Sequence, residues 1–202
     1  MLLFNYSTLV DPILKEVRTC AAGLSGIEAG DRVLDVCCGT GDQVFHYTQK
    51  GAIATGVDQE PSMIELAERN RKRRGFNHAT FRVASATELP FSEGYFDCAS
   101  ISLGLHEMER DERNRAVSEM KRVVRKEGVL MFIDFQVPLP RNIFAYAIGA
   151  VEFLAGSDNY TCFRDYLAQG GLKQILKENR LTQQKEALLM RGNLQMIKST
   201  NP

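Results

Sequence analysis

Residues 33–42 read Val-Leu-Asp-Val-Cys-Cys-Gly-Thr-Gly-Asp. An apolar run that ends in an acid and a glycine pair is typical of a buried strand, a tight loop and the start of a helix. Gly39 and Gly41 lack a Cβ, so the backbone there can take a positive φ and lie close to a ligand. The N–H groups at the start of the following helix would face the same ligand. The stretch therefore predicts a nucleotide-type site above the first strand of an open α/β sheet.

Strand-like and helix-like segments alternate along the rest of the chain with short spacers. The expected strands are 32–36, 52–57, 80–84, 97–102 and 129–135, and the expected helices are 11–22, 42–50, one that starts at Pro61, and 111–126. Strands separated by single helices predict a doubly wound, mostly parallel sheet of the α/β class. Residues 187–198 read instead as an antiparallel hairpin around a glycine turn. We expect a single domain over residues 1–202.

Composition and charge narrow the functional classes. Lys+Arg and Asp+Glu both number 25, so no net field favours nucleic acid as a partner. The five cysteines are an odd number without metal-binding spacing, which indicates reduced thiols, no metal site and a cytoplasmic location. The N-terminus lacks the basic start of a signal peptide. Residues 69–74 form a basic run, which fits a solvated helix end better than a nucleic-acid surface.

Polar or small residues also follow the next three strands. Asp58 ends the second strand, where a carboxylate can accept hydrogen bonds from two ribose hydroxyls. Ser85 and Ala86 follow the third strand, and Ser102 closes the fourth. A Gly-Thr-Gly turn alone could be a plain connection with no ligand. Four such segments in order at successive strand ends indicate one binding crevice instead.

Three stretches resemble the motifs of class I S-adenosylmethionine-dependent methyltransferases. They are residues 33–42, residues 57–63 (VDQEPSM) and residues 84–91 (ASATELPF). Residues 96–105 (FDCASISLGL) and 119–128 (EMKRVVRKEG) further resemble the UbiE-like branch, the quinone-biosynthesis C-methyltransferases. The resemblance implies a Rossmann-like methyltransferase fold with a seven-stranded sheet, and S-adenosyl-L-methionine as the cofactor.

Residue roles follow from the same resemblance. Thr40 and the backbone of its two flanking glycines would face the methionine part of the cofactor, and Asp58 would bind the ribose. Ser85 and Ala86 would hold the adenine edge, while Ser102 would lie near the sulfonium end. Asp35 would organise the loop and the amino group. The full set of expected cofactor-binding residues is Asp35, Cys37, Gly39, Thr40, Gly41, Asp58, Gln59, Met63, Ser85, Ala86, Thr87, Ser102 and Leu103.

The chain departs from the family pattern at three places. Cys37 stands where many relatives carry glycine, and Ser85 replaces the usual acid or asparagine. Residues 106–108 read His-Glu-Met, where the quinone branch carries Arg-Asn-Val. This last segment lines the acceptor side in such folds, so the identity of the methyl acceptor is open.

Two candidates for catalysis follow the fourth strand and the apolar segment. His106 could act as a general base, or it could be a loop histidine bonded to the backbone. Tyr160 could orient a substrate hydroxyl. Residues 143–155 are apolar apart from Glu152, and too short to span a bilayer. They could form part of a lid over residues 138–170, a wall for a lipophilic acceptor, or a peripheral membrane contact.

The leading hypothesis is methyl transfer from S-adenosyl-L-methionine to a small, lipophilic or quinol-like acceptor. One alternative is a non-catalytic cofactor-binding protein on the same fold. Another is a nicotinamide-dependent oxidoreductase, which shares the first half of the fold and the ribose acid. The sequence disfavours it, because the glycines do not follow the G-x-G-x-x-G spacing and no separate substrate domain follows.

Overall fold

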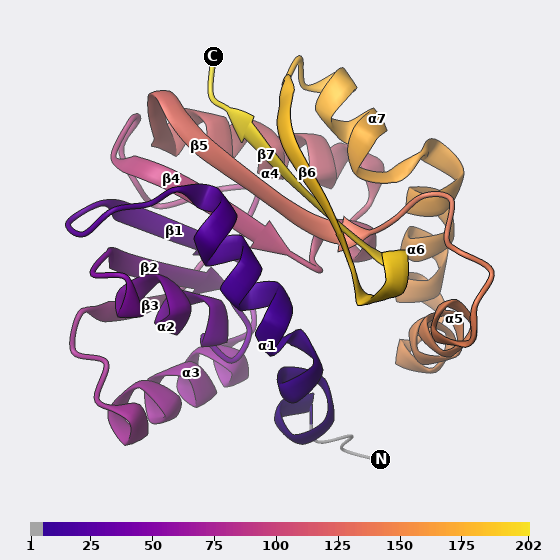
Figure 1. Ribbon diagram of the computed structural model, residues 1–202, viewed down its shortest axis with the longest axis horizontal. Coiled ribbons are helices and arrows are strands. Elements are labelled where there is room, and N and C mark those ends of the chain that lie inside the picture. Colours follow the sequence, from indigo (N-terminus) through magenta and orange to yellow (C-terminus); the bar gives the residue numbers. More distant parts are fainter. Residues whose placement is uncertain (1–5) are drawn as a thin grey trace.

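A seven-stranded sheet forms the centre of the protein (Figure 1). The computed structural model describes the backbone of residues 6–202, and the side chains of residues 14–202 except Ala155. The strands are β1 (Arg32–Val36), β2 (Ile53–Asp58), β3 (Ala79–Val83), β4 (Phe96–Ser102), β5 (Val124–Phe135), β6 (Gln183–Leu189) and β7 (Leu194–Thr200), in the spatial order β3-β2-β1-β4-β5-β7-β6. Strands β1 to β5 are parallel, and β7 is antiparallel to both β5 and β6. The predicted doubly wound sheet with a C-terminal antiparallel hairpin is confirmed.

Helices cover both faces of this sheet. They are α1 (Tyr6–Ser25), α2 (Asp42–Gln49), α3 (Pro61–Arg74), α4 (Arg110–Val123), α5 (Ile143–Ala155), α6 (Ser157–Gln169) and α7 (Gly171–Glu178), with short 3₁₀ turns η1 (Leu105–Glu107) and η2 (Met190–Gly192). The chain adds β2 and β3 on one side of β1, and then crosses over to add β4 and β5 on the other side, which reverses the strand order. Right-handed crossovers therefore place α2 and α3 on one face and α4 on the other. Figure 1 shows α1 in front of the sheet and α4 behind it. The reversal opens a crevice above the ends of β1 and β4.

The junction between α4 and β5 differs from the sequence prediction. The helix expected over 111–126 ends at Val123, because Val124 has extended backbone (φ −90°, ψ 134°) and already pairs with Phe96. Gly128, expected to follow a helix end, lies instead in an irregularity of the β4–β5 pairing. A Cβ on Gly128 would lie 2.5 Å from a Val124 methyl and 2.9 Å from the Asp97 carbonyl oxygen. The glycine thus allows a tight bulge rather than a helix cap.

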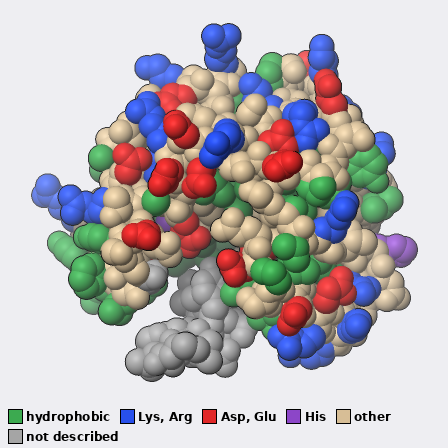
Figure 2. All heavy atoms as spheres, turned by 180° about the vertical axis from the view of Figure 1, so that it is seen from behind, with side chains coloured by type: hydrophobic (Ala, Val, Ile, Leu, Met, Phe, Trp, Pro, Cys, Tyr) green, Lys and Arg blue, Asp and Glu red, His purple; other side chains and the backbone are tan. Residues whose placement is uncertain are grey.

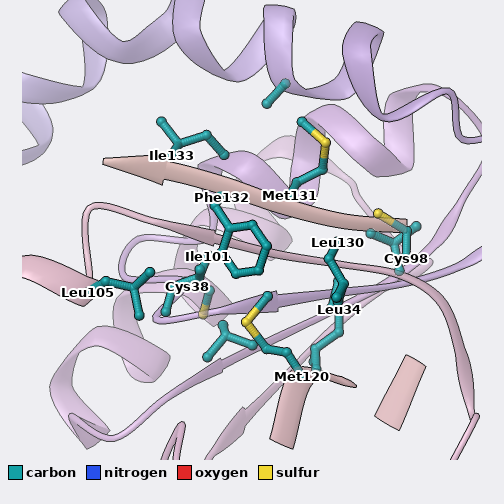
Figure 3. Close-up of a cluster of buried hydrophobic side chains, with 14 of the residues drawn as sticks. Leu34, Cys38, Cys98, Ile101, Leu105, Met120, Leu130, Met131, Phe132 and Ile133 are labelled. Carbon is teal, nitrogen blue, oxygen red and sulfur yellow. The ribbon is translucent and has the colours of Figure 1, made fainter. Parts of the chain in front are cut away.

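The core lies around the three central strands. Leu34, Leu130 and Phe132 are fully buried, and Figure 3 shows side chains of β1, β4 and β5 packed with Met120 of α4. These strands are covered on both faces, which explains why they read as continuous apolar runs. Further along, α5 and α6 occupy most of the segment 138–170. The N-terminal helix extends beyond the expected 11–22 at both ends.

The outer surface mixes acidic and basic side chains, as Figure 2 shows for one face. Much of the basic run at the end of α3 is paired within the chain. Arg71 lies 2.8 Å from Glu68, Arg74 lies 2.7 Å from Asp42, and Arg73 donates to Asn70. Across residues 6–202, no helix combines the length and the apolar character that crossing a bilayer requires.

Candidate cofactor and acceptor site

A cavity of about 320 Å³ opens at the carboxyl ends of β1, β2 and β4. It lies at the reversal of strand order, where ligands of such sheets bind. The residues that line it are Cys37, Gly39, Thr40, Asp58, Gln59, Glu60, Met63, Ala84, Ser85, Ala86, Thr87, Ser102, Leu103, Gly104, Glu107, Met108 and Glu112. Eleven of the thirteen expected cofactor-binding residues are in this set; Asp35 and Gly41 are not.

The loop after β1 is held in a strained, compact form. Cys37, Gly39 and Gly41 have positive φ values of 57°, 50° and 82°. For Cys37 this conformation is uncommon, and such strain often accompanies a binding site. A Cβ on Gly41 would lie 2.6 Å from the ring of Phe81, so only glycine fits there. Gly41 therefore serves packing and the start of α2, while the Gly39 side of the loop faces the cavity.

Asp58, the last residue of β2, connects that strand to the glycine loop after β1. Its Oδ2 accepts a hydrogen bond from the Gly39 N–H at 2.9 Å, and its Oδ1 accepts one from the Glu60 N–H at 3.0 Å. Each carboxylate oxygen can accept a further bond. The carboxylate thus fixes the glycine loop against β2 and still presents acceptors to the cavity.

Ser85 and Thr87 shape the wall beyond β3. The Ser85 hydroxyl accepts the Thr87 N–H at 3.2 Å and lies 2.9 Å from the Thr87 hydroxyl. This local turn fixes the Ser85 hydroxyl at the wall of the cavity. Ala86 and Met63 supply the apolar part of the same wall.

The side chains that line the cavity carry only negative charge. Asp58, Glu60, Glu107 and Glu112 are among them, and none of the lining residues within the described part of the chain is Lys or Arg. His106 Nε2 lies 4.0 Å from Glu107 Oε1 behind the lining, so Glu107 has a positive neighbour there. The net charge of the lining is still negative, which favours a positively charged ligand. A diphosphate would meet repulsion from the same four groups. The lining therefore suits a cationic cofactor better than a nicotinamide dinucleotide.

Asp35 lies behind the glycine loop rather than in the cavity. It is buried, and its Oδ1 accepts a hydrogen bond from the Ser100 hydroxyl at 2.6 Å. Burial raises the pKa of this carboxyl to about 7, against the opposing effects of Ser100 and Arg18. Asp35 would therefore affect the cofactor indirectly, by positioning the glycine loop.

His106 sits in η1 and is buried outside the cavity lining. Its Nδ1 lies 2.6 Å from Asp134 Oδ1, and Asp134 Oδ2 accepts the N–H groups of Leu105 and His106. Burial lowers the pKa of the imidazole, but the adjacent Asp134 and Glu152 carboxylates outweigh this and raise it to about 10. The ring is thus an imidazolium at neutral pH, a state that cannot accept a proton. Its assignment as a general base stays a prediction.

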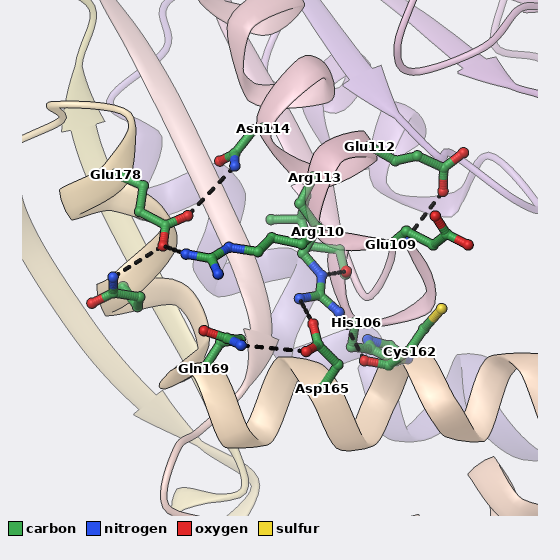
Figure 4. Close-up of polar contacts among 12 residues, drawn as sticks. His106, Glu109, Arg110, Glu112, Arg113, Asn114, Cys162, Asp165, Gln169 and Glu178 are labelled. Atoms are coloured by element: carbon green, nitrogen blue, oxygen red, sulfur yellow. Dashed lines mark hydrogen bonds and ion pairs between the residues drawn. The ribbon is translucent and has the colours of Figure 1, made fainter.

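Arg113 of α4 forms hydrogen bonds to both η1 and α6, as Figure 4 shows for its contacts with α6. The buried guanidinium donates to the Leu105 carbonyl at 2.9 Å, to Asp165 at 2.8 Å and to the Cys162 carbonyl at 2.7 Å. Arg113 was not among the residues expected at the site, although its sequence position carries a signal. Arg113 falls at the helical spacing of the apolar stripe of α4. A cation on such a stripe indicates buried partners.

Tyr160 of α6 packs against Phe153, with ring centroids 5.4 Å apart, and is not among the cavity residues. Its role in orienting a substrate also stays a prediction. Six of the lining residues were not expected as site residues: Glu60, Ala84, Gly104, Glu107, Met108 and Glu112. Glu107 and Met108 were noted only as part of the departure at 106–108. Nearness to a strand end was the available signal for Glu60, Ala84 and Gly104, whereas Glu112 lies within α4 and had no such signal.

Comparison with known proteins agrees with this geometry. The family described as "Methyltransferase domain" matches residues 33–128. The ubiquinone/menaquinone biosynthesis C-methyltransferase UbiE of Citrifermentans bemidjiense is 34% identical over 125 residues, which cover 60% of this chain and 52% of that protein. The match thus spans about half the length of that relative. The uncharacterized methyltransferase sll0829 of Synechocystis sp. is 30% identical over 173 residues, covering 86% of this chain and 77% of that protein.

The fold is also found among solved structures. A SAM-dependent methyltransferase from Aquifex aeolicus superposes with a TM-score of 0.74 over 98% of this chain and 97% of that one, at 15% identity. The sequence relatives and the shared sheet agree with the motifs at the strand ends. The chain belongs to the class I S-adenosyl-L-methionine-dependent methyltransferases and is similar in sequence to UbiE.

Proposed function

We propose that the protein transfers the methyl group of S-adenosyl-L-methionine to a small, lipophilic or quinol-like acceptor. The observation that carries this is the convergence of four strand-end segments on one cavity, whose described lining holds four carboxylates and no Lys or Arg. The bound cofactor supplies an electrophilic methyl on a cationic sulfonium. An acidic lining stabilises that charge, and the compact glycine loop leaves room for the methionine part.

The residues divide into two groups along the cavity. Gly39 and Thr40 would bind the methionine part, Asp58 the ribose, and Ser85 with Ala86 the adenine edge. Ser102 ends β4 and Leu103 follows it. Both would lie beside the sulfonium, and the acceptor would then bind on the far side of the methyl group. Holding both reactants in line in this way can lower the barrier by roughly 7–11 kcal/mol.

The acceptor side combines apolar and acidic groups. Leu103, Gly104 and Met108 offer apolar contact, and Glu107 offers a carboxylate. Such a lining suits a neutral ring that bears a hydroxyl and disfavours an anionic acceptor. Glu107 could accept the proton of that hydroxyl. Partial desolvation at the cavity wall raises its pKa above the ordinary value and His106 opposes the rise, and the side chain is still 54% exposed, so the net effect on its pKa is modest. The UbiE name of the relatives points to the same chemistry.

The segment over 138–170 would act as a lid on this side. Helix α5 ends close to His106, because Glu152 Oε1 lies 3.6 Å from His106 Nε2. The turn η1 that carries His106 also carries Glu107. A lipophilic acceptor would therefore enter beside α5.

Titration calorimetry with S-adenosyl-L-methionine and its demethylated product tests the binding half of the proposal. We expect micromolar-range binding, weakened about 10-fold to 100-fold in Asp58→Asn through loss of charge-assisted hydrogen bonds. Asp97→Asn is the matched control, since Asp97 lies at the opposite end of β4. Folded protein without binding would refute the proposal.

Methyl transfer is then measured with labelled cofactor and a panel of hydroquinones, simple phenols and amines. Product mass that rises by one methylene identifies the acceptor class. We expect turnover with hydroquinones and loss of turnover, rather than of cofactor binding, in Glu107→Gln. Tight cofactor binding without product across the panel would favour a non-catalytic binding protein instead.

A further inference from the structure

Helix α5 presents its large apolar side chains to the outside. Ile143, Tyr146, Val151, Phe153 and Leu154 are exposed by 62–77%. In Figure 2, where the half-turn brings α5 to the left, hydrophobic side chains gather at the lower left of the molecule. Soluble surfaces rarely keep so many large apolar groups together without a partner.

The side of α5 that faces the protein carries small or apolar residues and one charged residue. Ala145, Ile148, Gly149 and Glu152 follow each other at helical spacing, and all of them are partly or fully buried. Glu152 is only 8% exposed, and its Oε1 lies 3.6 Å from the Nε2 of the protonated His106. A surface helix normally turns its charged residue to water and its apolar residues to the core. The ion pair with His106 holds α5 in the reverse orientation.

Exposed arginines surround this apolar face. The guanidinium of Arg191, in η2, lies 5.2 Å from the centre of the Phe144 ring. Arg164 lies 5.9 Å from the Tyr160 ring, which itself packs against Phe153. Arg141 precedes the helix and is exposed as well. Asp158, at the start of α6, offsets part of this charge.

We propose that α5 docks on an anionic lipid bilayer, with its axis in the plane of the membrane and the arginines at the headgroups. A helix of 13 residues is about 20 Å long, which suits lying in the interface and not crossing it. Arginine stems extend along apolar surface while their charged ends reach phosphates. An anionic bilayer thus matches both the apolar face and its positive rim.

Charge argues for a bilayer over a second copy of the chain. A two-fold contact through α5 would bring the two sets of Arg141, Arg164 and Arg191 towards one another. The only acid on α5 itself, Glu152, is turned inward and would not neutralise them. The inference does not rest on methyl transfer, since it uses only surface residues and the buried pair.

Co-sedimentation of the full chain with vesicles tests the proposal. The vesicles are pure phosphatidylcholine, or phosphatidylcholine mixed with phosphatidylglycerol, at equal lipid concentration. We expect clearly stronger binding to the anionic vesicles. The double substitution Phe153→Ser and Leu154→Ser should weaken binding about 100-fold or more, because two large apolar contacts are lost. Each of Arg141→Gln and Arg191→Gln should weaken only the anionic binding, by about five-fold.

Ile53→Ser is the matched control, because Ile53 is an exposed apolar residue at the start of β2, outside α5. It should leave vesicle binding unchanged. Calorimetric titration with the cofactor checks that each variant keeps its folded site. Equal binding by the Phe153/Leu154 variant and the parent chain would overturn the proposal. So would a concentration-dependent dimer, seen in sedimentation velocity, that this variant abolishes while vesicle binding is absent throughout.

Discussion

Asp35→Asn should stabilise the protein above neutral pH while it weakens the cofactor site. Asp35 is buried, and burial raises its pKa from 3.8 to about 7. Between these values the unfolded chain has lost the proton that the native state keeps. The native state therefore binds more protons, and this group makes the free energy of unfolding fall as the pH rises from about 4 to about 7. Asparagine carries no charge, and its amide oxygen can still accept the Ser100 hydroxyl.

The size of the gain follows from the pKa. A rise from 3.8 to about 7 corresponds to about 4 kcal/mol at 1.36 kcal/mol per pH unit. Reorganisation around the buried charge reduces this, so we expect the variant to be about 2 kcal/mol more stable at about pH 8. Near pH 4 both chains are neutral at this position, and their stabilities should converge.

Urea unfolding over this pH range measures the difference. Asp97→Asn provides a control of opposite sign. Burial tends to raise the pKa of Asp97, but hydrogen bonds from the Arg32 N–H and the Arg125 guanidinium lower it below the ordinary value. That contribution is present at neutral pH and lost in acid, so the control should be less stable at neutral pH. Parallel stability curves for Asp35→Asn and the parent chain would refute the reasoning.

Three further substitutions have predictable effects on stability. Gly56→Ala would place a methyl group 2.8 Å from the Cys38 sulfur and 2.8 Å from the Phe81 ring, and should cost about 1–3 kcal/mol. Gly23→Ala, in α1, meets nothing within 4 Å and should be neutral or stabilising. Thermal unfolding of the two variants measures the difference. Arg113→Met removes three hydrogen bonds of a buried guanidinium, one of them buried and two partly buried, and should cost about 2–4 kcal/mol in urea unfolding, with little recovery in Arg113→Lys. The pKa of His106 rises from 6.5 in the unfolded chain to about 10 in the folded protein, so the imidazolium stabilises the fold fully below pH 6.5 and this contribution is lost by about pH 10. In His106→Gln the free energy of unfolding should therefore fall less steeply between these two pH values. A variant curve with the parent's slope would contradict this.

Much of the sheet could be read from the sequence because its signals are local. The strand over 32–36 and the glycine loop after it follow from apolar periodicity and from the steric freedom of glycine. The end of α4 could not be read in this way. Gly128 is also a common residue after a helix, and only its contact with the Asp97 carbonyl shows that it belongs to a bulge. Helix propensity at 124–126 gives way there to pairing with β4.

The two halves of the cavity, which we propose bind the cofactor and the acceptor, differ in how their residues are held in place. Asp58 binds the Gly39 N–H across two adjacent parallel strands, so short motifs describe that half well. The turn η1 depends on distant residues, because Asp134 comes from β5 and Glu152 from α5. Substitutions far along the chain can therefore reshape the acceptor half and leave cofactor binding intact. This explains why one sequence predicts the cofactor more sharply than the molecule that receives the methyl group.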